Sequence, residues 1–179
     1  MPSPVGHALG GLAAGWLLQP RLPQVRPLAS AENLLFLTVA IAPDLDLLIG
    51  VHRGATHSLG ATGAVGVGVW ALRRGPGRGR FAAATSAAYG SHVLLDWLGV
   101  DTSPPLGVPA LWPFDAAYLQ APWQPFVAVS RRFHEPGLFW EPNALAIGRE
   151  ILILLPLLIL VGMWRRRLGL AVVHRPRQT

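Results

Sequence analysis

Histidine and aspartate side chains gather in four short clusters of a chain that is only 13% charged. Imidazole nitrogen and carboxylate oxygen are the donors that Zn²⁺ and similar divalent ions take, and metal sites draw them from several elements at once. The pattern therefore predicts a polynuclear metal site. Cysteine is absent, so such a site uses only nitrogen and oxygen ligands. The candidate ligands are His7, Asp44, Asp46, His52, His57, His92 and Asp96.

Two of the clusters place their side chains by local geometry. His92 and Asp96 are spaced i, i+4, so both emerge from one helix face and can converge on one ion. A buried, hydrogen-bonded His-Asp pair is the alternative. Asp44 and Asp46 follow Pro43, which disfavours regular helix at this point. Carboxylates among apolar neighbours are costly unless they are paired or bound to metal, although a solvated loop pair or a helix cap remains the alternative.

The segment 52–58 is the most polar part of the N-terminal half of the chain. Gly54 permits a sharp turn that brings the His52 and His57 imidazoles inward, whereas a solvated loop between helices is the alternative. Arg53 is expected to anchor Asp44 or Asp46, or to bind a phosphate or carboxylate of the substrate through its planar guanidinium. His7 lies in the first turns of the N-terminal apolar stretch, where a histidine in the capping region is the alternative.

Five apolar blocks predict the elements that carry these clusters. Apolar residues make up 51% of the sequence, and the blocks are separated by arginine, proline and glycine. We predict one all-α domain, 1–179, with the motifs in residues 1–115. A loop rich in proline and aromatic residues spans 99–142, a last helix spans about 144–164, and a basic tail spans 165–179. The apolar blocks are 5–18, 34–49, 58–72, 81–98 and 151–164.

Threading the blocks through a bilayer places most arginines on one side and most acidic residues on the other. Every positive charge is an arginine, and the net charge is +6. The positive-inside rule makes the arginine side and the C-terminus cytoplasmic. All four clusters then fall at the extracytoplasmic side of a five-helix transmembrane bundle, multi-pass in the inner (plasma) membrane. Helices of 14 to 16 residues span only about 21–24 Å, which is also typical of soluble core helices.

The order of the motifs resembles a known family. After the helix with His7 come Pro-Asp-x-Asp at 43–46, His-Arg-Gly-x-Thr-His-Ser at 52–58 and His-x-x-x-Asp at 92–96. Together they resemble the membrane-bound metal-dependent hydrolases of bacterial inner membranes, over about residues 1–115. The last motif is distantly similar to the sites of zinc-dependent phospholipase C and P1-type nucleases, which implies phosphoester chemistry by analogy. Residues 116–179 match no motif, so the roles of Arg131, Arg132, Arg149 and Glu150 stay open.

We therefore expect a hydrolase in which metal ions activate water, acting on a phosphoester or lipid-linked substrate at the membrane. Three aspartates favour two or more divalent ions, Zn²⁺ first, and Mn²⁺ or Mg²⁺ also accept such donors. Asp44 or Asp46 would bridge ions or act as general base, and Arg53 would steady the developing anion. The alternative is a non-catalytic membrane protein that binds or transports metal. Haem ligation is disfavoured by the carboxylates, and the placement of the arginines argues against nucleic acid as a partner.

Overall fold

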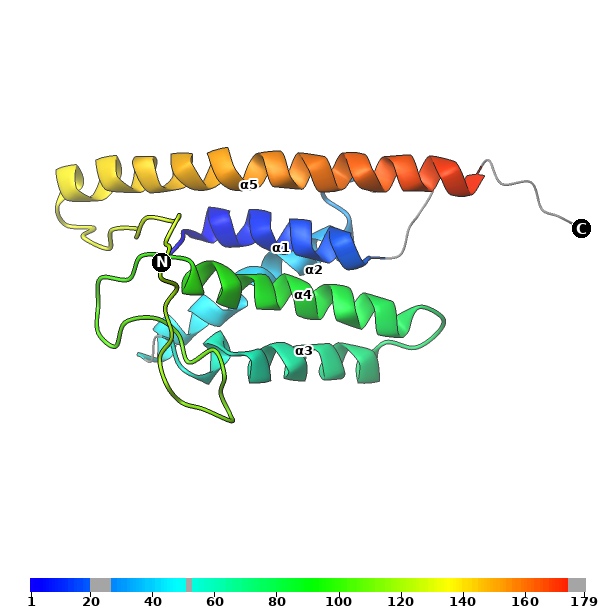
Figure 1. Ribbon diagram of the computed structural model, residues 1–179, viewed down its shortest axis with the longest axis horizontal. Coiled ribbons are helices and arrows are strands. Elements are labelled where there is room, and N and C mark those ends of the chain that lie inside the picture. The colour runs from blue at the N-terminus through cyan, green and yellow to red at the C-terminus, as the bar shows by residue number, and fades with distance from the viewer. Residues whose placement is uncertain (20–26, 51–52, 174–179) are drawn as a thin grey trace, which may run out of the picture.

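The computed structural model describes residues 1–19, 27–50 and 53–173, and the regular elements in this part of the chain are all helices (Figure 1). The side chains of residues 49 and 168–173 also lie outside that description. Within this part the only strand-like pairings are two isolated β-bridges, Gly99 with Phe126 and Val108 with Leu119. The elements are α1 (Pro4–Leu18), α2 (Ala31–Ile41), the 3₁₀ segments η1 (Ala42–Ile49) and η2 (Ala55–His57), α3 (Leu59–Leu72), α4 (Arg78–Trp97) and α5 (Pro136–Val173).

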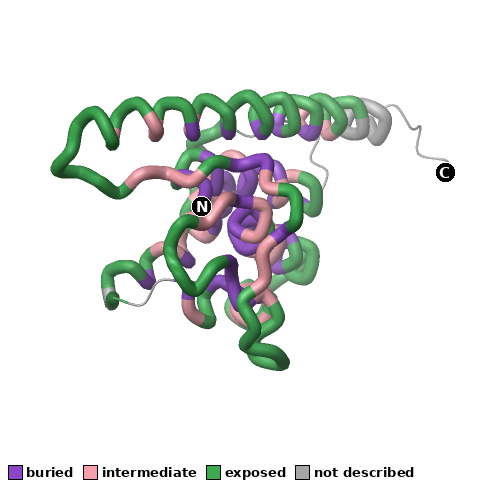
Figure 2. The backbone as a smooth tube through the Cα atoms, turned by 60° about the vertical axis from the view of Figure 1, so that its left-hand side comes forward, coloured by how far each residue is buried: buried purple, intermediate pink, exposed green. Residues whose placement is uncertain are grey.

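Helix α1 lies at the centre and packs against α2, α4 and α5, while α3 packs on the outer side of α4. The buried residues gather between these helices, whereas α5 is mostly exposed (Figure 2). Small residues in α1 allow the close approach, since a methyl group added at Gly11 would lie only 2.2 Å from the Cβ atom of Ala40 in α2. Phe36 and Ala88 fill the core at 0% exposure. The tight packing fixes where the first turns of α1 lie.

The prediction of a five-helix transmembrane bundle is wrong. Only the segment Pro136–Arg167 of α5 is long and apolar enough to cross a membrane among the residues described. At about 1.5 Å per residue, the 15, 11 and 14 residues of α1, α2 and α3 reach well short of the roughly 30 Å hydrocarbon core. Helix α4 has 20 residues, but Arg78 and Arg80 at its start and His92 and Asp96 near its end interrupt its apolar character.

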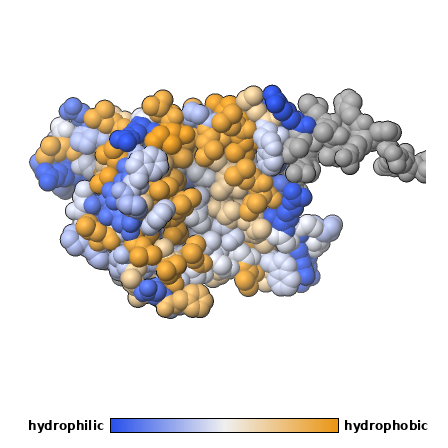
Figure 3. Space-filling view, viewed as in Figure 1, coloured by the Kyte–Doolittle hydropathy of each residue, from blue (hydrophilic) through white to orange (hydrophobic). Residues whose placement is uncertain are grey.

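Helix α5 begins earlier than the predicted helix, 144–164, and continues beyond it. It starts at Pro136 and runs for 38 residues, with Pro142 and Pro156 inside the helix. Hydrophobic side chains line its outward face along the middle of the molecule, and hydrophilic ones lie toward both ends (Figure 3). The predicted loop, 99–142, is therefore shorter at its C-terminal end, where residues 136–142 are helical.

The remaining loop packs on one end of the bundle. Its backbone joins the start of α3, where the Leu59 N–H donates to the Ala110 carbonyl at 2.8 Å. It also joins the N-terminus, where the Val129 N–H donates to the Met1 carbonyl at 3.2 Å. Val108 of this loop is fully buried and packs against Met1 and Val93. The start of α1, the end of α4, and η1 all lie at this same end (Figure 1).

Candidate metal centre

His7 is positioned by the cap of α1. The Ser3 side chain accepts hydrogen bonds from the N–H groups of Val5 and Gly6, which would otherwise lack partners at the start of the helix. The buried Glu150 side chain of α5 in turn accepts hydrogen bonds from the Ser3 N–H, at 2.6 Å, and from the Ser3 hydroxyl. His7 follows one turn later and is fully buried. Its ring faces the end of α4.

His92 and Asp96 lie on one face of α4, as their i, i+4 spacing predicts. His92 Nδ1 is 2.7 Å from the Ala40 carbonyl, so Nδ1 carries a hydrogen and Nε2 is the ring nitrogen that faces the other donors. That Nε2 atom is 3.1 Å from Asp96 Oδ2. The His7 ring stacks on the His92 ring at 3.7 Å, and His7 Nε2 is 3.3 Å from Asp96 Oδ1. These three side chains form one buried group.

Asp44 enters the group from η1. The chain changes from α-helix to 3₁₀ geometry at Ala42, next to Pro43, and this change turns Asp44 toward the end of α4. Asp44 Oδ1 is 3.6 Å from His57 Nε2 and 3.7 Å from His92 Nε2. Its side chain is 22% exposed, so it lies where the cluster meets solvent.

Asp46 lies on the far side of the His57 ring. Its Oδ2 atom is 3.2 Å from His57 Nδ1 and accepts a 2.9 Å hydrogen bond from the Thr56 hydroxyl. The opposite ring atom, His57 Nε2, is 3.5 Å from Asp96 Oδ2. Asp46 is therefore placed to orient His57, whereas His57 itself joins the other donors. We name the set of His7, Asp44, His57, His92 and Asp96 the His/Asp cluster.

Two further predicted site residues, Arg53 and His52, are not part of the His/Asp cluster as the structure describes it. Arg53 does not pair with Asp44 or Asp46 as expected; its guanidinium forms an ion pair with Asp101 and donates to the Ser103 carbonyl at 2.7 Å. Asp101, in the loop after α4, had no sequence signal that distinguished it. His52 lies outside the described residues, so its prediction as a ligand has no structural counterpart here.

Comparison with known protein families gives a match over most of the chain. A model of the YdjM inner membrane protein family matches residues 1–169 of the chain. The chain belongs to this family. No curated protein and no solved structure matches the chain. Membership in the YdjM family makes it an inner membrane protein, and α5 is the candidate span. It supports the bacterial inner membrane part of the predicted resemblance.

The unpaired atoms of the cluster fit a bound cation. Both ring nitrogens of His7, Nε2 of His92 and both carboxylate oxygens of Asp96 are buried and have no hydrogen-bond partner among the described residues. Buried polar atoms are normally paired, because an unpaired one costs about 1–3 kcal/mol. Two donors bound to one ion at about 2.1 Å lie about 3.0–3.4 Å apart by tetrahedral or octahedral geometry. The separations of 3.1–3.7 Å between the donor atoms of the cluster are close to that spacing.

The protonation of the cluster largely agrees with metal binding. Burial raises the pKa of the Asp96 carboxyl, but His7 and His92 outweigh burial and hold that pKa well below its usual range. Burial lowers the pKa of His7. A carboxylate and a neutral imidazole are the forms that bind metal. Burial also acts to lower the pKa of His92, but contact with Asp96 outweighs it and raises that pKa, so a cation would displace a proton there.

Proposed function

We propose that this YdjM-family protein is a metal-dependent hydrolase whose His/Asp cluster holds a divalent cation. The observation that carries the proposal is the group of buried nitrogen and oxygen atoms of His7, His92 and Asp96, which have no hydrogen bond among the described residues. They come from α1 and α4, helices far apart in the sequence, and face one another within a few ångströms. A purely structural cluster would join these atoms by well-formed hydrogen bonds, whereas here they lie 3.1 and 3.3 Å apart without one.

The composition of the cluster favours one ion. The sequence prediction of two or more ions counted three aspartates, but Asp46 is turned to the outer side of His57. Asp44 and Asp96 then supply a charge of −2, which one divalent cation neutralises. Three imidazoles with two carboxylates suit Zn²⁺ or Mn²⁺ better than Mg²⁺, because Mg²⁺ prefers oxygen ligands.

The chain's own residues supply the rest of the chemistry. When bound by His7, His57, His92 and Asp96, a divalent cation would supply a lowered pKa for water, toward about 7, and polarisation of a substrate oxygen. Asp44, at the solvent edge of the cluster, is the carboxylate best placed to accept a proton from that water as general base. Ser58 does not act as a nucleophile in this scheme, since its hydroxyl donates to the Ala55 carbonyl at 2.6 Å and caps α3.

We propose a phosphoester or lipid-linked substrate that reaches the site from the extracytoplasmic side. The apolar stretch of α5 is followed by three arginines, Arg165, Arg166 and Arg167. The positive-inside rule favours a cytoplasmic location for these arginines. The start of α1 and the end of α4, which carry His7, His92 and Asp96, lie toward the other end of α5 (Figure 1). This arrangement supports an active site near the outer surface of the membrane, with the C-terminus inside.

The test is metal content and hydrolysis in the same purified samples of the full chain. We expect about one metal ion per chain in the wild type and in His134→Ala, which removes a histidine outside the cluster. His92→Ala and Asp96→Asn should lose the metal, and with it hydrolysis of a model phosphodiester or of phospholipid vesicles. Unchanged metal content in both cluster variants would refute the site. Full metal content without any hydrolysis would favour a non-catalytic metal-binding protein.

A further inference from the structure

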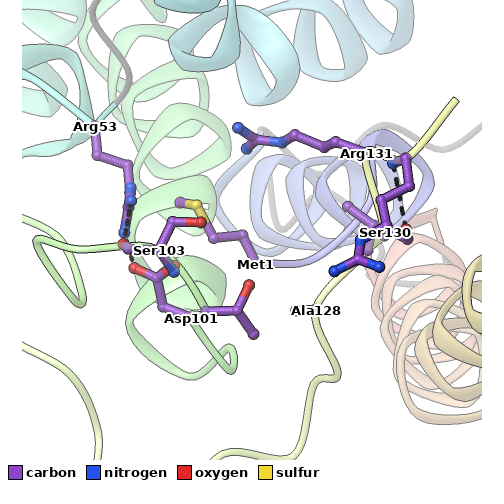
Figure 4. A pocket seen from close by; sticks show the side chains of 10 residues that line it. Met1, Arg53, Asp101, Ser103, Ala128, Ser130 and Arg131 are labelled. Atoms are coloured by element: carbon purple, nitrogen blue, oxygen red, sulfur yellow. Dashed lines mark hydrogen bonds and ion pairs between the residues drawn. The ribbon is translucent and has the colours of Figure 1, made fainter. Parts of the chain in front are cut away.

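A cavity of about 500 Å³ opens at the same end of the molecule as the His/Asp cluster. Its wall comes from Met1, Arg53, the segment 101–103 after α4, and residues 128–132 of the long loop (Figure 4). Arg53 lies four positions before the cluster residue His57. The cavity thus shares a chain segment with the cluster, and its volume is within the range of about 300–1,000 Å³ typical of small-molecule sites.

The wall of the cavity is strongly cationic. Three of its side chains are arginines, Arg53, Arg131 and Arg132, and one is acidic, Asp101. The Asp101 carboxylate is already engaged, because it pairs with Arg53 and accepts a 2.9 Å hydrogen bond from the Gly107 N–H. Three arginines against one aspartate leave a net side-chain charge of +2 on the wall. Such a cavity attracts anions.

Arg53 is held rigidly at the wall of the cavity by contacts with the loop that follows α4. It is only 4% exposed, and its Nε atom is buried without a hydrogen-bond partner among the described residues. Its backbone has φ 63°, in the left-handed region that a residue with a side chain rarely adopts. Strained residues of this kind are concentrated in ligand-binding sites. Arg53 therefore forms a fixed, positively charged part of the cavity wall, with its terminal nitrogens bonded to Asp101 and to the carbonyls of Ser103 and Pro105.

Arg131 approaches the same space from the opposite wall. Its side chain extends across the cavity toward Arg53 and Met1 (Figure 4). Burial lowers the pKa of Arg53, and the positive charge of Arg131 lowers it further, so the two guanidiniums are close enough to repel each other. An anion between them would remove that repulsion.

We propose that this cavity binds a phosphate group. A phosphate monoester carries a charge of about −1.5 to −2 at pH 7 and three acceptor oxygens, which matches the +2 wall and the planar guanidinium groups of Arg131 and Arg132. A carboxylate would balance only half of the charge. That this phosphate belongs to the substrate hydrolysed at the His/Asp cluster rests on the proposed function, whereas phosphate binding itself does not.

The experiment measures binding of inorganic phosphate and glycerol 3-phosphate to the full chain in detergent, by calorimetric titration at low ionic strength. The protein is treated with chelator so that no metal contributes. We expect saturable binding to the wild type, weakened at least tenfold by Arg131→Gln or by Arg132→Gln. Arg74→Gln is the matched control, since Arg74 carries the same charge at an exposed position outside the cavity and should leave binding unchanged.

Nanodiscs identify the source of the phosphate. The chain is placed in phosphatidylcholine discs with and without phosphatidic acid, and glycerol 3-phosphate is titrated again. If phosphatidic acid weakens the binding of glycerol 3-phosphate, the occupant is a lipid headgroup. If phosphatidic acid has no effect on that binding, the occupant is a soluble phosphate ester. The proposal is overturned if neither phosphate compound binds, if acetate binds as tightly, or if Arg74→Gln weakens binding as much as Arg131→Gln does. Metal content is measured separately, so failure to bind phosphate would not contradict the metal site. Failure to bind metal would likewise not contradict the phosphate site.

Discussion

Asp46 provides the sharpest test of the cluster, because the structure gives it a different role from the other aspartates. Its Oδ2 atom lies 3.2 Å from His57 Nδ1, on the side of the ring away from Asp44 and Asp96. An ionised carboxylate there keeps the hydrogen on Nδ1 and the lone pair on Nε2, where a metal binds. We predict that Asp46→Asn weakens metal binding without abolishing it.

The size of the predicted loss of metal affinity follows from the hydrogen-bonding groups that asparagine retains. Its side-chain oxygen can still accept from the Thr56 hydroxyl or from His57 Nδ1, but it carries no negative charge, and its NH₂ group cannot accept a hydrogen bond. Loss of such an orienting partner typically costs 10–100-fold in metal affinity, or about 1.4–2.7 kcal/mol. Asp96→Asn removes a donor from the middle of the cluster and should cost far more.

The assay is competition of the purified chain with a fluorescent chelator for Zn²⁺ at pH 7. The wild type, Asp46→Asn and Asp96→Asn are compared, and Thr56→Val serves as a milder perturbation that removes the hydroxyl bond to Asp46 and leaves the carboxylate. If Asp46→Asn loses its metal as completely as Asp96→Asn, then Asp46 is a ligand and the assignment is wrong. If Asp46→Asn binds as tightly as the wild type, then Asp46 does not orient His57.

Three further predictions concern stability, and thermal unfolding of the full chain in detergent measures each of them. Gly11→Ala should destabilise by about 1–3 kcal/mol, because the new methyl group would lie 2.2 Å from Ala40 Cβ, whereas Gly63→Ala has open space and should match or exceed the wild type. An equal response of both variants would contradict the packing. Removing the metal with a chelator should lower the unfolding free energy by about 2.7 kcal/mol relative to protein with free Zn²⁺ at 100 times its dissociation constant, and re-addition should restore it; no shift would refute the metal site. Glu150→Ala should lower the free energy of unfolding by about 1–3 kcal/mol, since it leaves the buried Ser3 N–H without an acceptor. Glu150→Gln should lower it less. An unchanged stability of Glu150→Ala would contradict this contact.

The part of the candidate site that depends on local geometry could be predicted from the sequence. The i, i+4 spacing of His92 and Asp96 fixes them on one face of a helix whatever surrounds it. Pro43 indicated the change of helix geometry that turns Asp44 toward them. Helices that alternate in direction also bring the start of α1 and the end of α4 to the same end of a bundle, so the meeting of His7 with His92 followed from helix order.

The rest depends on contacts between distant residues, which no local pattern encodes. Asp46 and Asp44 are separated by one residue, yet one orients His57 and the other joins the cluster, because the 3₁₀ geometry of η1 sends them in different directions. Arg53 pairs with Asp101, in a loop that has no regular structure to predict. The count of membrane spans was wrong because apolar composition alone does not distinguish short packed helices from crossing ones.

The contact between Glu150 and Ser3 joins the candidate span to the candidate site. Glu150 belongs to α5, and Ser3 caps the helix that carries His7 one turn later. A fully buried carboxylate is retained in such a position only when its partners compensate its desolvation, and here the partners are the cap itself. The first turn of α1 is therefore anchored to α5 rather than left to fray as a free helix end would. The position of His7 therefore depends on α5 as well as on the packing of α1 against α2 and α4, so the helix that the membrane would hold contributes to the geometry of the His/Asp cluster.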